Sequence, residues 1–333
     1  MNAQTTKTIL KNVFKFGLMA GIIYYLYAKG LLDFSRVRAV LADPVVVAVG
    51  ICVILGTSTL CVMRWRMLLA GQGIRISFGD AFRLTFIGMF FNTALPGAVS
   101  GDVVKGYYIV KQQPEGKGKS KAFATLFLDR ILGVSGLIIV AFSAMAANYA
   151  SMMEIQRLRP LVGFIFITFA GLVLFYAFML KKWRFTNRIN ETLKGLPLGS
   201  YLSKIFEAFK CYEDSPRIIL GSLLLSVLVH SSLVLFIRMM AGDLGSFQSV
   251  PPAAFFLLTP LGLLVTAVPV APAGLGTGHA AFFALFQLVG SSGGADLFTV
   301  FVAFQLMINL SGGVFYLRYK HNHPSTEIPA SVG

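Results

Sequence analysis

The sequence predicts an all-α integral membrane protein with about six full transmembrane helices and two oppositely oriented re-entrant helical hairpins. Of the 333 residues, 56% are hydrophobic and 13% are charged, and the mean hydropathy is +0.74. An ordinary soluble domain is about 45–50% apolar and about 25% charged. Several apolar runs also reach the ~20 residues that a helix needs to cross the hydrocarbon core. These two observations together indicate a polytopic membrane protein.

Six runs qualify as full spans, each flanked by basic residues or turn formers at one or both ends. They cover residues 13–32, 44–63, 122–148, 160–180, 218–240 and 297–317. We interpret the first run as a retained span, because it is longer than a signal-peptide core and carries Lys29 where small residues would be expected.

The basic residues predict the orientation of these spans. With a cytoplasmic N-terminus, the segments on the outer side hold few cations, namely Lys29, Arg36, Arg38, Arg157, Arg159 and Arg238. The cytoplasmic segments hold nearly all the others, including Arg64, Arg66, Arg75 and Arg83 after the second span. This bias predicts that both termini are cytoplasmic. The net charge of +15 therefore reflects topology, and no nucleic-acid partner is indicated.

This orientation requires residues 78–110 and 250–290 each to enter and leave on one side, as re-entrant hairpins. Each contains a Pro/Gly break, NTALPGAVSGD at 92–102 and PVAPAGLGTGH at 269–279, through which a helix cannot run. Non-helical backbone at membrane depth is tolerated only where protein or a water-filled cavity supplies hydrogen bonds. The second half then repeats the first in inverted orientation, an architecture found in many secondary transporters.

The chain is predicted to form a single transmembrane domain over 1–320, with pseudo-repeat halves 13–148 and 160–318 and a short disordered tail at 321–333. A stretch at 183–214 interrupts the second half. In it Tyr201, Ile205, Phe209 and Tyr212 share one helical face, which predicts an amphipathic helix on the cytoplasmic membrane surface. The alternative is a connector without a functional role.

The hairpin breaks are the predicted substrate site. A half-helix starting near Gly101 and another near Gly276 would present free N–H groups to a phosphate, with Lys105 and Arg130 as the cations. In the alternative interpretation, Asp102 and Thr277 are only N-caps, and Arg130 only pairs with Asp102 or Asp129. The predicted substrate-binding residues are Asn92, Pro96, Gly97, Ser100, Gly101, Asp102, Lys105, Arg130, Pro272, Gly274, Gly276, Thr277 and His279.

Four further polar residues are predicted to serve coupling or structure. Asp129 precedes Arg130 within a span, and because neighbouring helical residues do not face each other, the two need different partners. His230 is a candidate for proton coupling, as is His279, although a neutral, hydrogen-bonded histidine is the alternative. Gln305 and Asn309 suit a pocket or a contact between helices. No catalytic residue, metal site or cofactor is predicted, and the three cysteines lack paired spacing.

The motifs FFNTALPGAVSGDVVKGYYIVKQ, LDRILGVSGL and PVAPAGLGTGHAAFFALF resemble the lysylphosphatidylglycerol synthase transmembrane, or flippase-like, family over nearly the whole chain. The resemblance implies a bacterial inner-membrane protein that moves a phosphate-bearing or polyprenyl-linked lipid, and the inverted repeat indicates alternating access as the mechanism. The family commonly has Arg at the position of Lys105 and Glu at that of His279. We expect no synthase activity, because no aminoacyl-transferase domain follows the last span.

Two other functions stay open at this point. A lipid-modifying transferase would need a positioned acid/base or metal constellation, and a transporter of small solutes or ions could use the same architecture. The sequence leaves open which lipid is bound, what drives its movement and whether the protein is a homo-oligomer.

Overall fold

The computed structural model describes Gly17 and residues 20–94, 100–111, 119–181, 186–195, 199–268 and 272–322, and the regular secondary structure in this part of the chain is helical. Five helices are long and apolar enough to cross a membrane: Pro44–Gly71, Lys121–Ala147, Gln156–Leu180, Pro216–Leu244 and Gly294–Tyr319. They match five of the six predicted spans, which confirms the all-α membrane class. The other predicted span, 13–32, lies partly outside the described residues and is helical over 20–28.

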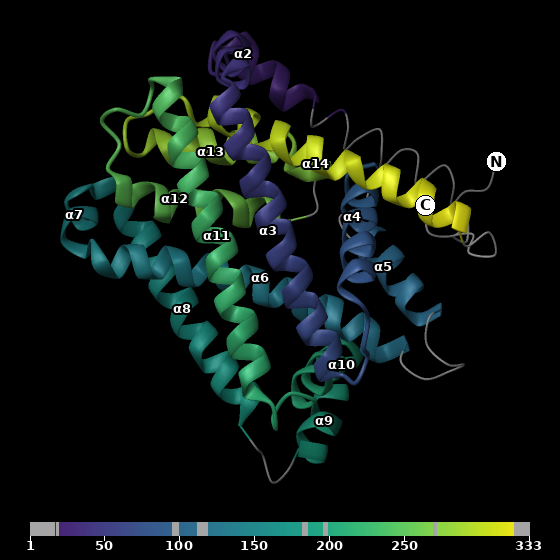
Figure 1. The fold of residues 1–333 in the computed structure, drawn as a ribbon. Helices are drawn as coiled ribbons and strands as arrows, with labels where there is room; N and C mark the ends of the chain where they lie inside the picture. Colours follow the sequence, from purple (N-terminus) through teal and green to yellow (C-terminus); the bar gives the residue numbers. More distant parts are fainter. Residues whose placement is uncertain are drawn as a thin grey trace.

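The long helices alternate with short ones in the predicted order (Figure 1). The long helices are α3 (Pro44–Gly71), α6 (Lys119–Ala147), α8 (Arg159–Leu180), α11 (Pro216–Leu244) and α14 (Gly294–Asn322). The first hairpin consists of α4 (Phe78–Ala94) and α5 (Ser100–Lys111), and the second of α12 (Pro252–Thr266), η2 (Pro272–Gly274) and α13 (Thr277–Gln287). The remaining short helices are α2 (Phe34–Ala42), α7 (Tyr149–Glu154), η1 (Gln156–Leu158), α9 (Thr186–Lys194) and α10 (Gly199–Lys210).

The contacts of the two halves correspond pairwise. At the centre α3 lies along α11, the equivalent helix of the second half. The first arm of each hairpin crosses into the opposite half, so that α4 packs on α14 and α12 packs on α6. The second arm of each hairpin packs within its own half, α5 on α6 and α13 on α14. The main contacts of α4 and α5 thus have counterparts in those of α12 and α13.

The break of the second hairpin has left-handed backbone just before α13. Ala273, Gly274 and Gly276 have φ values of 51°, 69° and 81°, a region that glycine adopts without steric cost. The break predicted at 269–279 is therefore present. In the first hairpin, residues 95–99, with the predicted site residues Pro96 and Gly97, lie outside the described residues. Contact between α4 and η2 brings the two hairpins together.

The helix α3 is longer than the sequence predicts. It was expected to end at residue 63 and to leave Arg64 in a cytoplasmic loop, but it continues to Gly71 with Arg64 buried inside it. That assignment of Arg64 is wrong. A charged residue can lie within a span when a partner neutralises it, and the charge pattern alone does not reveal such a partner.

The insertion at 183–214 forms two short helices, α9 and α10, where one amphipathic helix was expected. The side chains of Tyr201, Ile205 and Phe209 lie outside the described residues. Tyr212 is fully buried and its hydroxyl donates to the Leu68 carbonyl oxygen at 2.6 Å. Burial raises the pKa of Tyr212 above its usual value. Tyr212 therefore attaches the insertion to α3 and does not face the membrane surface.

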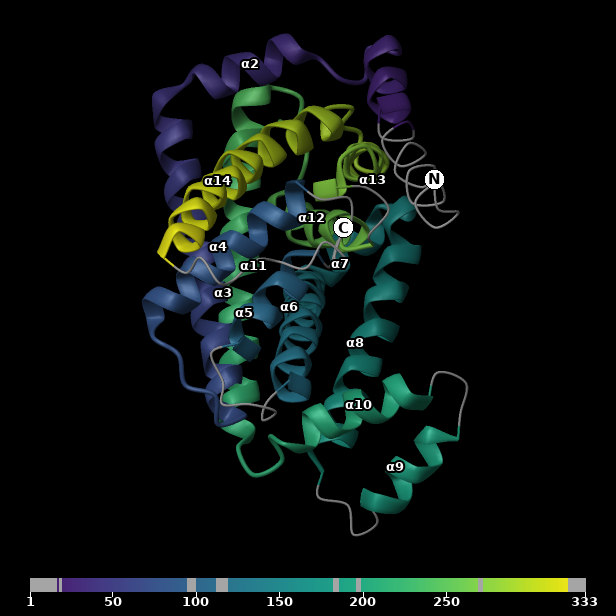
Figure 2. The ribbon, with the colours of Figure 1, turned by 90° about the vertical axis from the view of Figure 1, so that its right-hand side faces the viewer.

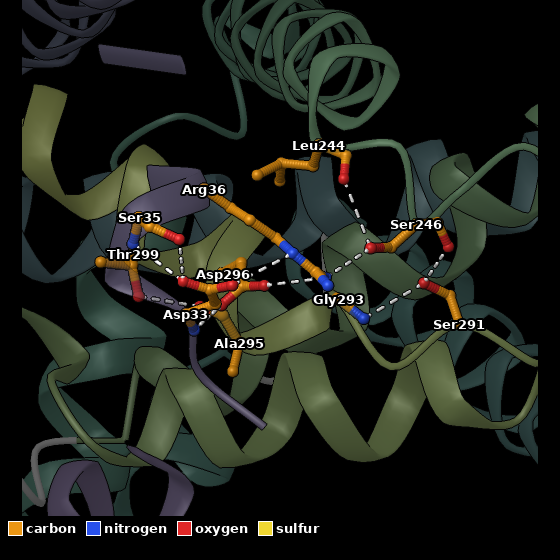
Figure 3. Close-up of polar contacts among 10 residues, drawn as sticks. All are labelled: Asp33, Ser35, Arg36, Leu244, Ser246, Ser291, Gly293, Ala295, Asp296 and Thr299. Atoms are coloured by element: carbon orange, nitrogen blue, oxygen red, sulfur yellow. Dashed lines mark hydrogen bonds and ion pairs between the residues drawn. The ribbon is translucent and has the colours of Figure 1, made fainter. Parts of the chain in front are cut away.

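At the opposite end of the molecule, α2 is fixed by a cluster of polar contacts (Figures 1, 2 and 3). The Asp33 N–H donates to Oδ1 of the buried Asp296 at 2.7 Å. Arg36 lies 3.3 Å from Asp33 Oδ2 and 3.9 Å from Asp296 Oδ2, and it donates to Ser246 Oγ at 3.1 Å. Hydrogen bonds from the side chain and backbone of Ser35 lower the pKa of Asp33. The cluster joins α2 to the start of α14 and the end of α11.

Removing the carboxylate of Asp296 should weaken the attachment of α2 to α14 and lower the stability of the protein. In Asp296→Ala the Asp33 N–H loses its acceptor, so we expect the free energy of unfolding to fall by about 1–3 kcal/mol. Arg36→Gln is the control, because the half-exposed ion pairs of Arg36 should contribute about 1 kcal/mol or less. Unfolding in lipid bicelles measures both. An equal loss in the two variants would show that Asp296 acts only through Arg36.

Candidate functional site

Three helices each contribute two nearby groups to one charged cluster, which we call the polar centre: Arg64 and Trp65 on α3, Asp102 and Lys105 on α5, and Asp129 and Arg130 on α6. Arg64 donates to Asp129 through Nε at 2.7 Å and through Nη2 at 3.1 Å. Its Nη1 donates to Ser226 Oγ on α11 at 2.8 Å. The two-point ion pair of mostly buried side chains joins α3 to α6, and the hydrogen bond to Ser226 adds α11.

The next residue on α6 joins the first hairpin to the bundle. Arg130 forms an ion pair with Asp102 on α5. Asp129 and Arg130 thus have different partners, as their adjacent positions on a helix predict. The carboxylate of Asp102 is turned to Arg130, so its interpretation as a simple N-cap is not supported.

Lys105 has no matching carboxylate. Its side chain is 7% exposed, and its ammonium lies 4.0 Å from the centre of the Trp65 ring. Among the residues that the structure describes, none forms an ion pair or hydrogen bond with Lys105. The buried indole N–H of Trp65 also lacks an acceptor in this part of the chain. Two neighbouring donors are therefore left without acceptors.

The charges of the polar centre do not cancel. The carboxylates of Asp129 and Asp102 match the guanidinium groups of Arg64 and Arg130, which leaves the positive charge of Lys105. A buried charge is costly unless it is paired and hydrogen-bonded. The aromatic ring of Trp65 supplies part of this stabilisation. A single negative charge would supply the rest.

Glycine allows the first hairpin to place Lys105 there. A side chain on Gly101 would overlap the backbone carbonyl of Gly88, so the two arms approach each other directly. A Cβ on Gly88 would lie 2.7 Å from Cδ of Lys105, whose stem occupies that space. The ends of the arms are tied by Asn92 Oδ1, which accepts the Gly101 N–H at 2.9 Å, and by Ser100 Oγ, which donates to the Phe91 carbonyl at 3.0 Å.

At the start of α13, the polar groups are hydrogen-bonded to residues of the same hairpin. The N–H of Gly276 donates to Nδ1 of His279 at 3.2 Å, so this ring nitrogen is unprotonated. His279 is buried, with its ring against the edge of Phe298. Thr277 Oγ1 donates to the Gly274 carbonyl at 3.2 Å, which is not an N-cap contact. The N–H groups of Gly101 and Gly276, predicted to be free for a phosphate, are both engaged within the chain.

The structure places the remaining predicted residues between helices. His230 Nε2 lies 3.0 Å from the Gly133 carbonyl oxygen, next to the contact of Arg64 with Ser226. Asn309 donates to Thr93 Oγ1 at 3.1 Å and so joins α14 to the end of α4, and Gln305 is half-buried one turn earlier. Pro272 begins η2. The second hairpin reaches the first through the contact of η2 with α4.

Reasoning from the sequence missed Arg64 and Trp65 as site residues. Arg64 follows an apolar run, and such a position ordinarily marks the end of a span. One signal could have found it, because Asp129 lies within a predicted span and an acid there requires a cation from another helix.

Comparisons with known proteins agree with this architecture. Residues 12–310 match the model of the lysylphosphatidylglycerol synthase TM region. A similar protein is the UPF0104 membrane protein PH1989 of Pyrococcus horikoshii, 37% identical over 102 residues, which are 30% of this chain and 30% of that protein. No solved structure gives a significant match. Because the match to the family model covers most of the chain, the protein belongs to the lysylphosphatidylglycerol synthase transmembrane family.

Proposed function

We propose that the polar centre binds the phosphate of a lipid head group and that the protein moves this lipid across the bacterial inner membrane, with both termini cytoplasmic. Lys105 carries the proposal, as a buried cation without a carboxylate beside an indole N–H without an acceptor. A phosphodiester provides one negative charge for the Lys105 ammonium and several acceptor oxygens for the Trp65 indole N–H. Arg130, 40% exposed, is placed to share the anion.

The architecture supports transport more than chemical conversion. Interrupted helices of the kind seen in the second hairpin are typical of alternating-access transporters. The carboxylates of the polar centre are both held in ion pairs with arginines, which suits them to structure rather than to proton transfer. We therefore propose a lipid transporter without enzymatic activity.

Lys105→Met tests the proposal because it removes the charge and retains an unbranched apolar stem. We expect the binding of phosphatidylglycerol by the purified protein to weaken about tenfold or more, since a hydrogen bond to a charged group contributes about 1.5–3 kcal/mol. The matched control is Lys111→Met, an exposed lysine on the same helix. Proteoliposomes with head-group-labelled phosphatidylglycerol measure transbilayer movement in parallel.

The stability of Lys105→Met separates binding from a structural role. If Lys105 binds the lipid phosphate, the lipid-free variant should unfold at the same temperature as the wild type or higher, because a buried unmatched charge has been removed. Unchanged lipid binding in Lys105→Met would refute the site. Turnover of the labelled lipid by purified protein would favour the transferase instead.

A further inference from the structure

A second feature with the properties of a lipid site lies on the opposite side of α6 from the first hairpin. It is an apolar groove of about 630 Å³, within the ~300–1,000 Å³ range of ligand pockets. Phe169, Tyr176 and Leu180 of α8 form one wall, Leu220 and Leu223 of α11 form the other, and Ile139 of α6 contributes to the lining. The hydroxyl of Tyr176 lies 2.9 Å from Ser135 Oγ.

The groove lies beside α8, the least buried of the five candidate spans in the described part of the chain. Only 11% of the apolar window of α8 is buried, compared with 33–44% in the other four candidate spans. Lipid therefore has access to α8 over most of its length. From Phe169 to Leu180, α8 rises about 16 Å at 1.5 Å per residue. This length is about half of the ~30 Å hydrocarbon core and corresponds to the acyl chain of one leaflet.

One end of the groove is cationic. Arg217, in the first turn of α11, lines this end and is exposed. In the described part of the chain Arg217 forms no ion pair or hydrogen bond, whereas the nearby Lys210 is paired with Glu213 at 2.8 Å. The positive end of the α11 dipole lies at the same place. The apolar groove is about as long as one leaflet is thick and has a cation at its end. These properties match a lipid with an anionic head group.

We propose that this groove binds one anionic phospholipid, with an acyl chain between α8 and α11 and its phosphate at Arg217. The rest of the lining is nearly all apolar, so a soluble anion would gain nothing from it. A zwitterionic lipid would gain less from Arg217, because the cation of its own head group offsets the phosphate charge. The site is separate from the polar centre and does not depend on the function proposed for it. It lies at the end of the molecule that carries α9 and α10 (Figures 1 and 2).

The test reconstitutes the full chain in bilayers of equal parts phosphatidylglycerol and phosphatidylcholine with identical acyl chains. The protein is then purified in detergent, and the lipids that stay bound to it are quantified. All variants carry Lys105→Met, so that lipid held at the polar centre does not contribute. Arg217→Gln should lower the ratio of retained phosphatidylglycerol to phosphatidylcholine about tenfold. Arg75→Gln should leave it unchanged, because Arg75 is an exposed cation in the loop after α3, at the same end of the molecule.

A second pair of variants tests the apolar part. Ala177→Trp fills the groove and should reduce the retention of both lipids, whereas Ala170→Trp changes α8 outside the lining and should not. An unchanged lipid ratio in Arg217→Gln would overturn the proposal. So would a protein dimer, measured by light scattering, that Ala177→Trp dissociates, because the occupant of the groove would then be a second copy of the chain.

Discussion

Gly101→Ala is expected to destabilise the protein severely, although it adds one methyl group. The new Cβ would overlap the Gly88 carbonyl, which is backbone and cannot rotate away, so α4 and α5 would have to separate. Overpacking of this kind typically costs about 1–3 kcal/mol and occasionally more. Separation would also strain the bond from the Gly101 N–H to Asn92. The midpoint of thermal unfolding in detergent measures the effect.

Gly56→Ala is the matched control. Gly56 lies within α3, and a Cβ at this position meets nothing within 4 Å. The methyl group should therefore be tolerated, because it also raises intrinsic helix propensity. Equal unfolding midpoints for the two variants would show that the arms of the first hairpin are not in direct backbone contact.

Arg64→Met is expected to have the second large effect, a loss of about 3–5 kcal/mol, because it leaves the mostly buried Asp129 carboxylate without its cation. Ser226 Oγ would lose its donor as well. Arg64→Lys should recover only part of the loss, since a single ammonium cannot reproduce the two-point contact with Asp129 together with the bond to Ser226. The free energy of unfolding in bicelles is the measurement.

The double variant Arg64→Met with Asp129→Leu shows whether the loss comes from the unpaired charge. Replacing both partners of a buried ion pair by apolar residues is often neutral or stabilising. We therefore expect the double variant to be more stable than Arg64→Met alone. A double variant that is less stable would mean that each residue contributes through other contacts.

The sequence was sufficient for five of the six spans and for the break in the second hairpin, because these depend on local properties. An apolar run of ~20 residues predicts a span, and a cluster of proline and glycine predicts a break, regardless of what surrounds them. Even the need of Asp129 and Arg130 for separate partners followed from helical geometry. The re-entry of the hairpins from the membrane surface stays a prediction, as do the predicted substrate contacts.

Pairings between distant helices could not be predicted. Arg64 was assigned to a loop because its partner Asp129 lies 65 residues away. The N–H groups of Gly101 and Gly276 were expected to be free, yet Asn92 and His279 accept from them. Such acceptors depend on how each hairpin closes, which composition and periodicity do not encode. Lys105 was chosen for its position, whereas its lack of a carboxylate became visible only in three dimensions.

The bond from the Asp33 N–H to Asp296 also bears on the order in which the chain assembles. Its two partners are 263 residues apart, and membrane proteins are synthesised and inserted from the N-terminus onward. The first hairpin can close on its own residues early in synthesis. The α2 segment therefore has to wait until the start of α14 has been synthesised. The contacts around Asp296 thus form only after the second half of the chain has been inserted, and until then α2 lacks this attachment.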